Sequence, residues 1–210
     1  MTVHVAFAGV GGQGILSAAR LLGEACHRSG LCVTIAELHG MSQRGGAVQT
    51  TVSIGDTGGA GGSLSPEGER LDVLVGLELV ETARLAPRLR ADSTVVCNRW
   101  LVPPQRSVLM RRPVPKADVI VAELRRLTEI LVLIDANGLA EQAGAQTGAN
   151  LVLLGALAAL PACPVSPEAL LDVIRDFGRD ADRTARERAF SLGMAAGQDR
   201  SGGHRTATSG

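Results

Sequence analysis

The amino-acid sequence predicts an α/β domain built on a doubly wound, mainly parallel, Rossmann-like sheet, with a helical C-terminal tail. Short runs of Val, Leu and Ile alternate along the chain with helical patterns. Glycine-rich turns follow two of the early apolar runs. Hydrophobic residues form 45% of the 210 residues and aromatic residues only 2%, which favours an aliphatic core around a sheet covered on both faces.

The first half of the chain predicts the part of the sheet that carries the glycine turns. An apolar run at 3–8 is followed by a helix over 13–28, which Ser29 and Gly30 end, and by a strand at 31–36. We expect these to form a βαβ unit whose two turns lie at the carboxyl ends of neighbouring strands. A further strand is predicted at 47–54, and the glycine-rich stretch 55–63 is predicted as a surface loop.

The second half continues the alternation and ends in helices. Strands are predicted at 72–76, 93–97, 107–110 and 129–135, and helices at 78–89, 117–127, 136–143, 150–160, 167–177 and 181–196. Ser166 caps the helix that begins at Pro167, and four prolines predict irregular structure around 98–115. Residues 1–198 are expected to form one domain, and residues 199–210 a disordered tail, because the tail has little to bury.

The helix at 150–160 is almost wholly apolar, so it is expected to be internal or at a subunit interface. Together with the glycine turns it predicts a patch for another subunit, with an obligate interface above about 2,000 Å².

Composition and cysteine spacing exclude several classes of function. The 21 basic and 21 acidic residues balance, which gives no electrostatic case for binding nucleic acid or an anionic membrane. No apolar stretch is long enough for a membrane span, so a soluble, cytoplasmic protein is expected. The four cysteines form no CxxC pair, and neither an iron–sulfur cluster nor a structural zinc is expected. They are Cys26, Cys32, Cys97 and Cys163.

The first turn fits a cofactor-binding loop. Its glycines follow a strand and open a helix in a GxGxxG pattern, so that free N–H groups at the helix N-terminus face a phosphate. Glu37, at the end of the next strand, is placed to accept from a ribose hydroxyl. The alternative is that the glycines only let the helix pack tightly on the sheet. The candidate cofactor-binding residues are Gly9, Gly11, Gly12, Gln13, Gly14 and Glu37.

The second turn fits a substrate or interface loop. Arg44 lies between Gln43 and a Gly-Gly pair, where a guanidinium beside exposed amides suits a phosphate or carboxylate. His39 is interpreted as a scaffold residue without a catalytic role. The candidate substrate or interface residues are His39, Gly40, Met41, Ser42, Gln43, Arg44, Gly45 and Gly46.

No catalytic residue is assignable from the sequence. Neither Ser17 nor Ser42 lies in a GxSxG setting, no carboxylate pair is evident, and no metal site is predicted. A thiamine diphosphate site needs a GDG turn with downstream asparagines, which the chain does not supply. The chain therefore has the features of half of a site.

Two glycine-rich stretches together resemble a known family. GVGGQGIL at 9–16, followed by HGMSQRGG at 39–46, is similar to the γ-type domain of 2-oxoacid:acceptor (ferredoxin) oxidoreductases, and most similar to the small (β) subunit type of the indolepyruvate enzymes. Three later stretches agree in order and spacing, at 66–72, 133–136 and 149–157, and the resemblance covers about residues 3–196.

The resemblance implies one non-redox subunit of an enzyme that oxidatively decarboxylates a 2-oxoacid to an acyl-CoA and reduces ferredoxin. Thiamine diphosphate, Mg²⁺ and iron–sulfur clusters are then expected on a larger partner subunit, with none bound by this chain alone. Coenzyme A is the implied co-substrate, and the glycine turns face the partner's thiamine site. The rival hypothesis is a stand-alone NAD(P)- or nucleotide-binding Rossmann protein, which would use Glu37 and have little need of the turn at 40–46.

Overall fold

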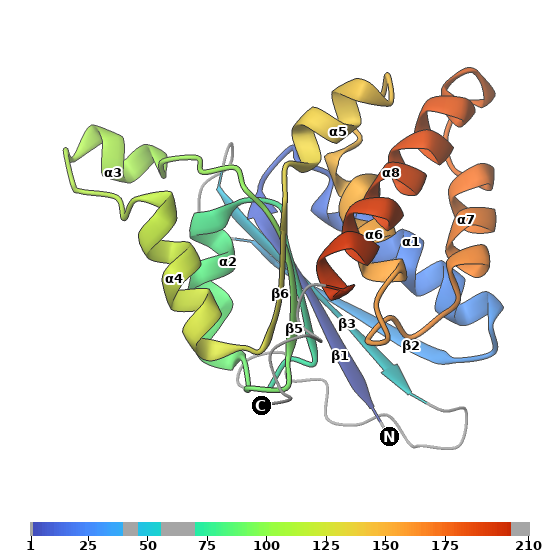
Figure 1. Cartoon of the computed structure of the whole chain (residues 1–210), viewed down its shortest axis with the longest axis horizontal. Coiled ribbons are helices and arrows are strands. Elements are labelled where there is room, and N and C mark those ends of the chain that lie inside the picture. The colour runs from blue at the N-terminus through green and yellow to red at the C-terminus, as the bar shows by residue number, and fades with distance from the viewer. Residues whose placement is uncertain (1, 40–45, 56–69, 203–210) are drawn as a thin grey trace.

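The computed structural model describes residues 2–39, 46–55 and 70–202, and within these residues six strands form one sheet (Figure 1). The strands are β1 (Val3–Val10), β2 (Cys32–His39), β3 (Ala47–Gly55), β4 (Val73–Gly76), β5 (Thr94–Asn98) and β6 (Ile130–Ile134). Their order in the sheet is β2-β3-β1-β4-β5-β6. The pairs from β1 through β4 and β5 to β6 are parallel, and β3 is antiparallel to both of its neighbours.

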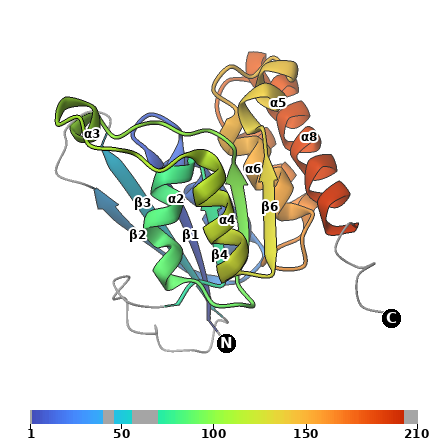
Figure 2. The same ribbon diagram turned by 60° about the vertical axis from the view of Figure 1, so that its left-hand side comes forward.

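Helices cover both faces of the sheet, as the two views show (Figures 1 and 2). They are α1 (Ile15–Arg28), α2 (Leu79–Leu85), α3 (Gln105–Leu109), α4 (Ala117–Leu127), α5 (Ala136–Gln142), α6 (Ala149–Ala158), α7 (Pro167–Asp176) and α8 (Arg183–Gly202), with 3-10 turns η1 (Ala86–Arg88) and η2 (Asp180–Asp182). One face is covered by α1 and the helices from α5 onward, and the other by α2 and α4.

The residues of β1 show how the chain supplies two cores. Val5 and Phe7 are buried in the core beneath α1 and α6, whereas Ala6 and Ala8 are buried in the core beneath α2 and α4. Successive side chains of a strand point to opposite faces, so a strand that is apolar throughout requires cover on both sides. The predicted doubly wound α/β fold, with its C-terminal helix, is confirmed.

The predicted βαβ unit of neighbouring strands is wrong, because β3 lies between β1 and β2. Only residues 40–46 connect β2 to β3, and a parallel crossover needs about a dozen residues or more. The two strands therefore pair antiparallel, with Cys32 opposite Gly55 and His39 opposite Val48. The carboxyl ends of β1 and β2 still lie at the same edge of the sheet, but one strand apart.

Two local predictions also differ from the structure. Residues 107–110 were expected as a strand, yet this region holds the short helix α3, in which the amides of Ser107 and Val108 donate to the Pro104 carbonyl (2.9 and 3.1 Å). Proline fixes the φ angle that a first helical turn requires. The last helix continues to Gly202, beyond the predicted domain boundary at 198. The predicted loop at 56–63 and the tail from 203 lie outside the described residues.

The apolar helix α6 is internal, which is one of the two placements predicted for it, so α6 itself contributes no surface patch for another subunit. Its residues from Asn150 to Ala158 are all buried, and α8 covers it. The two helices meet through glycines: a Cβ on Gly155 would lie 2.0 Å from the Phe190 carbonyl oxygen, and one on Gly193 would lie 2.0 Å from that of Val152. No helix in the described part of the chain combines the length and apolarity that crossing a membrane requires.

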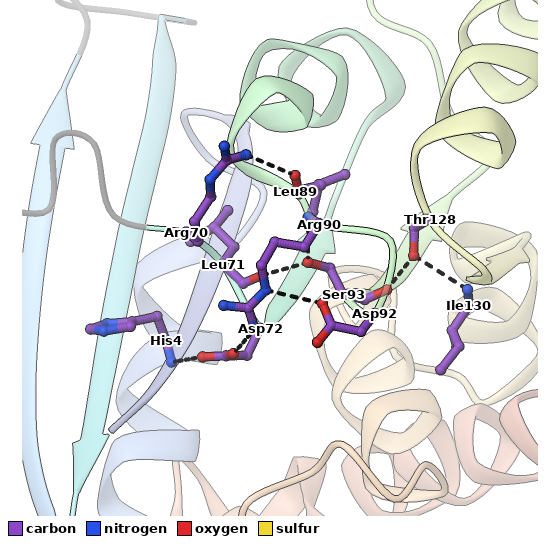
Figure 3. Close-up of polar contacts among 10 residues, drawn as sticks. All are labelled: His4, Arg70, Leu71, Asp72, Leu89, Arg90, Asp92, Ser93, Thr128 and Ile130. Atoms are coloured by element: carbon purple, nitrogen blue, oxygen red, sulfur yellow. Dashed lines mark hydrogen bonds and ion pairs between the residues drawn. The ribbon is translucent and has the colours of Figure 1, made fainter. Parts of the chain in front are cut away.

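The amino ends of the strands are joined by polar contacts that satisfy one another (Figure 3). The carboxylate of Asp72, just before β4, accepts from the His4 amide (2.7 Å) and from the Arg90 guanidinium (2.6 Å). The Ser93 hydroxyl, just before β5, donates to the Leu71 carbonyl (2.6 Å). This edge therefore has a structural role.

Two buried thiols predict a loss of stability in alkali. Burial raises the pKa of Cys26 and of Cys97 to about 12 from the usual value of 9.0. The unfolded chain releases these protons at lower pH than the folded chain does, so the thiols' contribution to stability is complete below about pH 9 and is lost as pH rises toward 12. Melting temperatures measured from pH 7 to 11 should fall above pH 9, and less steeply for Cys97→Ala. Parallel curves for the two proteins would contradict this account.

Candidate functional site at the carboxyl edge of the sheet

The first glycine turn joins β1 to α1 and requires glycine for two different reasons. Gly12 and Gly14 have φ angles of 97° and 81°, which side chains rarely adopt. At Gly9 the reason is steric, because a Cβ there would lie 3.0 Å from Cβ of Leu77 and 2.5 Å from Oε1 of Gln13, which would have to leave its place in the turn. That oxygen accepts from the Val10 amide (2.8 Å), so Gln13 holds the turn in shape from within.

The first turn is bonded directly to the end of the second. The Gly11 amide donates to the Gly46 carbonyl (3.0 Å), one residue before β3 begins. The neighbouring pair Val10 and Ala47 continues the β1–β3 register. His39, the last residue of β2, flanks the other end of the second turn. Gly46 and His39 thus bring both predicted turns to one surface, while residues 40–45, with Arg44 among them, lie outside the described residues.

The amides of the first turn are mostly used within the protein. Those of Val10 and Gly11 are bonded as above, and the Gln13 amide donates to the Val10 carbonyl (3.1 Å). A dinucleotide-binding turn offers such amides to a pyrophosphate. Because these three amides already have acceptors within the protein, the geometry supports a phosphate-binding turn only weakly. Gly11 and Gly12 are exposed and form a smooth backbone surface that another molecule can approach closely.

Glu37 is badly placed for the predicted ribose contact. The prediction required β2 to lie next to β1, but Glu37 pairs with Thr50 of β3, and β3 separates it from β1. Two strand spacings amount to about 10 Å. The strand order therefore offers no support for a nucleotide held by Glu37 and the first turn together.

A pocket of about 190 Å³ opens on the side of the first turn that faces the ends of β4 and β5. The sequence did not predict a pocket there. The chain leaves β1 toward β2 on one side and later returns to β4 on the other, so the carboxyl end of β1 is a topological switch point, the usual place for a ligand in such sheets. The pocket is lined by Gly12, Gln13, Leu77, Trp100, Asn137, Gln146, Thr147 and Ala149.

A buried carboxylate shapes the wall of this pocket. Glu78, two residues after the end of β4, is fully buried and caps α2 by accepting from the amides of Val80 (3.0 Å) and Glu81. It also accepts from the amide of Val102 (3.3 Å). The next amide, of Leu79, donates to the Trp100 carbonyl (2.8 Å). The start of α2 therefore fixes the segment that presents Trp100 to the pocket.

Two asparagines hold the other walls. The buried Asn98 side chain, at the end of β5, donates to the Leu77 carbonyl (3.2 Å) and accepts from the Ala136 amide (3.0 Å). The Asn150 amide group donates to the Gly14 carbonyl (3.2 Å), which ties the start of α6 to the glycine turn. The signal for Glu78 and Asn98 was available in the sequence, since both are polar residues at or just after the carboxyl end of a buried strand.

A larger groove of about 480 Å³ lies away from this edge, between α1, β2 and α7. Its rim contains Arg28, which pairs with Glu24 (2.8 Å) and Asp176 (2.6 Å). These three charges satisfy one another, whereas Arg20 and His27 also line the groove. The smaller pocket has both the glycine turn and the convergent polar groups, and we take it as the candidate site.

The described residues do not fit an iron–sulfur cluster. Such a cluster needs converging thiolates, but Cys26 and Cys97 lie in the cores on opposite faces of the sheet, where burial keeps each thiol protonated. Cys32 is exposed on β2. Among the described residues no group of three or more His, Cys, Asp or Glu side chains could hold a metal ion.

The fold and this site define an α/β protein with a glycine-lined candidate site at a topological switch point of its sheet. Residues 4–196 match the family model described as pyruvate ferredoxin/flavodoxin oxidoreductase. The chain is 35% identical to the indolepyruvate oxidoreductase subunit IorB of Methanothermobacter thermautotrophicus over 176 residues, 84% of this chain and 88% of that one. It is 36% identical to IorB of Thermococcus kodakarensis over 201 residues, 93% of this chain and 96% of that one. The chain belongs to the pyruvate ferredoxin/flavodoxin oxidoreductase family, and the resemblance drawn from the sequence is confirmed.

Solved structures share the fold. The keto/oxoacid ferredoxin oxidoreductase gamma subunit of Geobacter sulfurreducens has a TM-score of 0.68 at 22% identity, over 94% of this chain and 99% of that one. The 2-oxoglutarate:ferredoxin oxidoreductase of Magnetococcus marinus has a TM-score of 0.69 at 20% identity, over 94% of this chain but 31% of that one. The same fold thus occurs as a separate subunit and within a longer chain.

Proposed function

We propose that this chain is the non-redox small subunit of a multi-subunit, thiamine-diphosphate-dependent 2-oxoacid oxidoreductase of the indolepyruvate type. The complex would oxidatively decarboxylate a 2-oxoacid to an acyl-CoA and pass the electrons to ferredoxin. Family membership and the curated IorB relatives support this assignment. The observation that carries the site is the Gly11–Gly46 hydrogen bond (3.0 Å), because it joins both family motifs in one surface.

In this proposal the chain supplies one wall of a shared active site. The exposed backbone at Gly11 and Gly12 allows a close approach, and the pocket beside Trp100 offers an aromatic face with amide and hydroxyl groups around it. Such a surface suits the 2-oxoacid and the coenzyme A thiol end. Thiamine diphosphate, Mg²⁺ and the clusters would be held by a larger partner, and thiamine diphosphate supplies the carbanion chemistry there.

The decisive experiment is reconstitution with the larger subunit. The chain should be co-purified with the product of a neighbouring reading frame that carries GDG and CxxC motifs. We expect ferredoxin reduction that requires both chains, a 2-oxoacid and coenzyme A, with indolepyruvate compared against pyruvate and 2-oxoglutarate. Micromolar NAD(P) binding by the isolated chain, with no such activity in the complex, would instead favour the stand-alone nucleotide-binding protein.

Arg44 remains a sequence prediction for the anion contact of this site. Losing a charge-assisted hydrogen bond costs about 1.5–3 kcal/mol, so Arg44→Ala should lower kcat/KM of the complex roughly ten- to a hundredfold. Arg44→Lys keeps the charge without the planar fork and should recover only part of this loss. Varying the 2-oxoacid and coenzyme A separately identifies the anion through the KM that rises. Arg20→Ala, on the exposed side of α1, is the matched control. Unchanged constants in an assembled Arg44→Ala complex would remove Arg44 from the site.

A further inference from the structure

The most exposed large apolar side chains of the described residues are concentrated in one segment. Leu109 is 84% exposed, and Val108, Val119, Met110 and Trp100 follow it in exposed fraction. All five lie between β5 and the first turns of α4. A run of three such side chains in water is unfavourable unless another surface covers it.

Residues 99–116, which hold all of these side chains except Val119, project from the body of the molecule and will be called the arm (Figures 1 and 2). It leaves the carboxyl end of β5, carries α3 at its tip and returns to α4. Trp100 lies at its base and lines the candidate pocket. The apolar tip and the pocket are therefore continuous along one short stretch of chain on the glycine-lined side of the sheet.

The arm is also strongly basic, in a chain whose charges balance overall. It contains five basic residues and no acidic one: Arg99, Arg106, Arg111, Arg112 and Lys116. Within the described part of the chain, neither Arg111 nor Arg112 nor Lys116 takes part in an ion pair. Like charges around an apolar tip disfavour contact between two arms, and they favour an acidic partner surface.

We propose that the arm is the docking element for the larger subunit and that α3 enters an apolar recess bordered by carboxylates on that subunit. This inference rests on the proposed function, which supplies the partner. Docking at the tip would also close the partner against the base of the arm, next to Trp100, so that assembly and the shape of the pocket are coupled. The arm then contributes the apolar core of the contact and its basic rim steers the encounter.

The test measures binding of the full chain to the isolated larger subunit at 50 and 300 mM NaCl. Leu109→Asp should weaken the Kd at least about tenfold at both salt concentrations, because it places a charge in the apolar recess. Arg111→Glu with Arg112→Glu should slow association about tenfold at 50 mM, and by less at 300 mM, where charges are screened. Phe177→Asp is the matched control, because this exposed apolar residue follows α7, away from the arm. The Kd of this variant for the larger subunit should equal that of the wild type. Melting temperatures confirm that each variant is folded.

The outcomes separate the two proposals. Wild-type binding that the arm variants leave unchanged overturns the arm proposal and leaves the proposed function standing. A wild-type chain that binds no larger subunit refutes both. Self-association of the wild-type chain that Leu109→Asp abolishes, or binding to anionic vesicles in place of the subunit, shows that the arm has another occupant and also overturns the proposal.

Discussion

Replacement of Gly193 by valine is expected to lower the melting temperature by about 6–12 °C or more. A Cβ at this position would lie 2.0 Å from the Val152 carbonyl oxygen of α6, and the obstacle is backbone, which has no rotamer to change. Relief requires α8 to move away from α6 and to loosen the contact around Gly155. Overpacking of this kind costs about 3 kcal/mol, and each kcal/mol shifts the melting temperature of a chain of this size by about 2–4 °C.

The matched control for Gly193→Val is Ala195→Val, two residues along on the exposed side of the same helix. It introduces the same β-branched side chain without the contact, so only a few tenths of a kcal/mol in helix propensity are expected. Equal melting temperatures for the two variants would show that α6 and α8 do not approach as closely as the structure indicates.

Replacement of Glu78 by leucine is expected to cost about 3 kcal/mol, because buried amides lose their acceptor. Those amides belong to Val80, Glu81 and Val102, the first two at the start of α2 and the third in the segment after Trp100. Thermal unfolding of the isolated chain measures this loss in the free energy of unfolding. In the reconstituted complex we also expect a raised KM for the 2-oxoacid or coenzyme A, because the pocket wall loses its anchor.

Two variants separate capping from positioning. Glu78→Gln keeps one acceptor oxygen and should recover part of the stability and of the KM. Ser166→Ala removes an exposed N-cap, that of α7, and should cost about 1 kcal/mol with no change in KM. If Glu78→Leu lowers the melting temperature but leaves both KM values unchanged, Glu78 caps α2 and has no part in shaping the pocket.

The sequence predicted most of the fold because strands such as β1 and β5 are apolar on both faces, and that pattern depends only on local residue order. The direction of β3 was not predictable in the same way, since its residues read as a strand whichever way it pairs. Its direction follows from the length of the connection at 40–46. The predicted Glu37 contact loses its structural basis for this reason, because it depended on which strand lies next to β1.

The candidate site was predictable where glycine has a geometric role and not where side chains converge from distant elements. The φ angles of Gly12 and Gly14 agree with the turn inferred from their spacing. The Glu78–Val102 contact joins residues 24 positions apart, and the Asn150–Gly14 contact joins residues 136 apart. Such pairs are brought together only by the order of strands in the sheet, which one sequence does not reveal.

Trp100 gives the site an optical property of its own. It is the only tryptophan in the chain, which has no tyrosine, so essentially all near-ultraviolet fluorescence comes from one indole. That indole is 48% exposed and lines the pocket beside Gly12. Its emission wavelength therefore reports how wet this single position is, without a label or a second fluorophore to subtract. A molecule that binds in this pocket and covers the Trp100 indole is expected to shift the emission maximum of the protein.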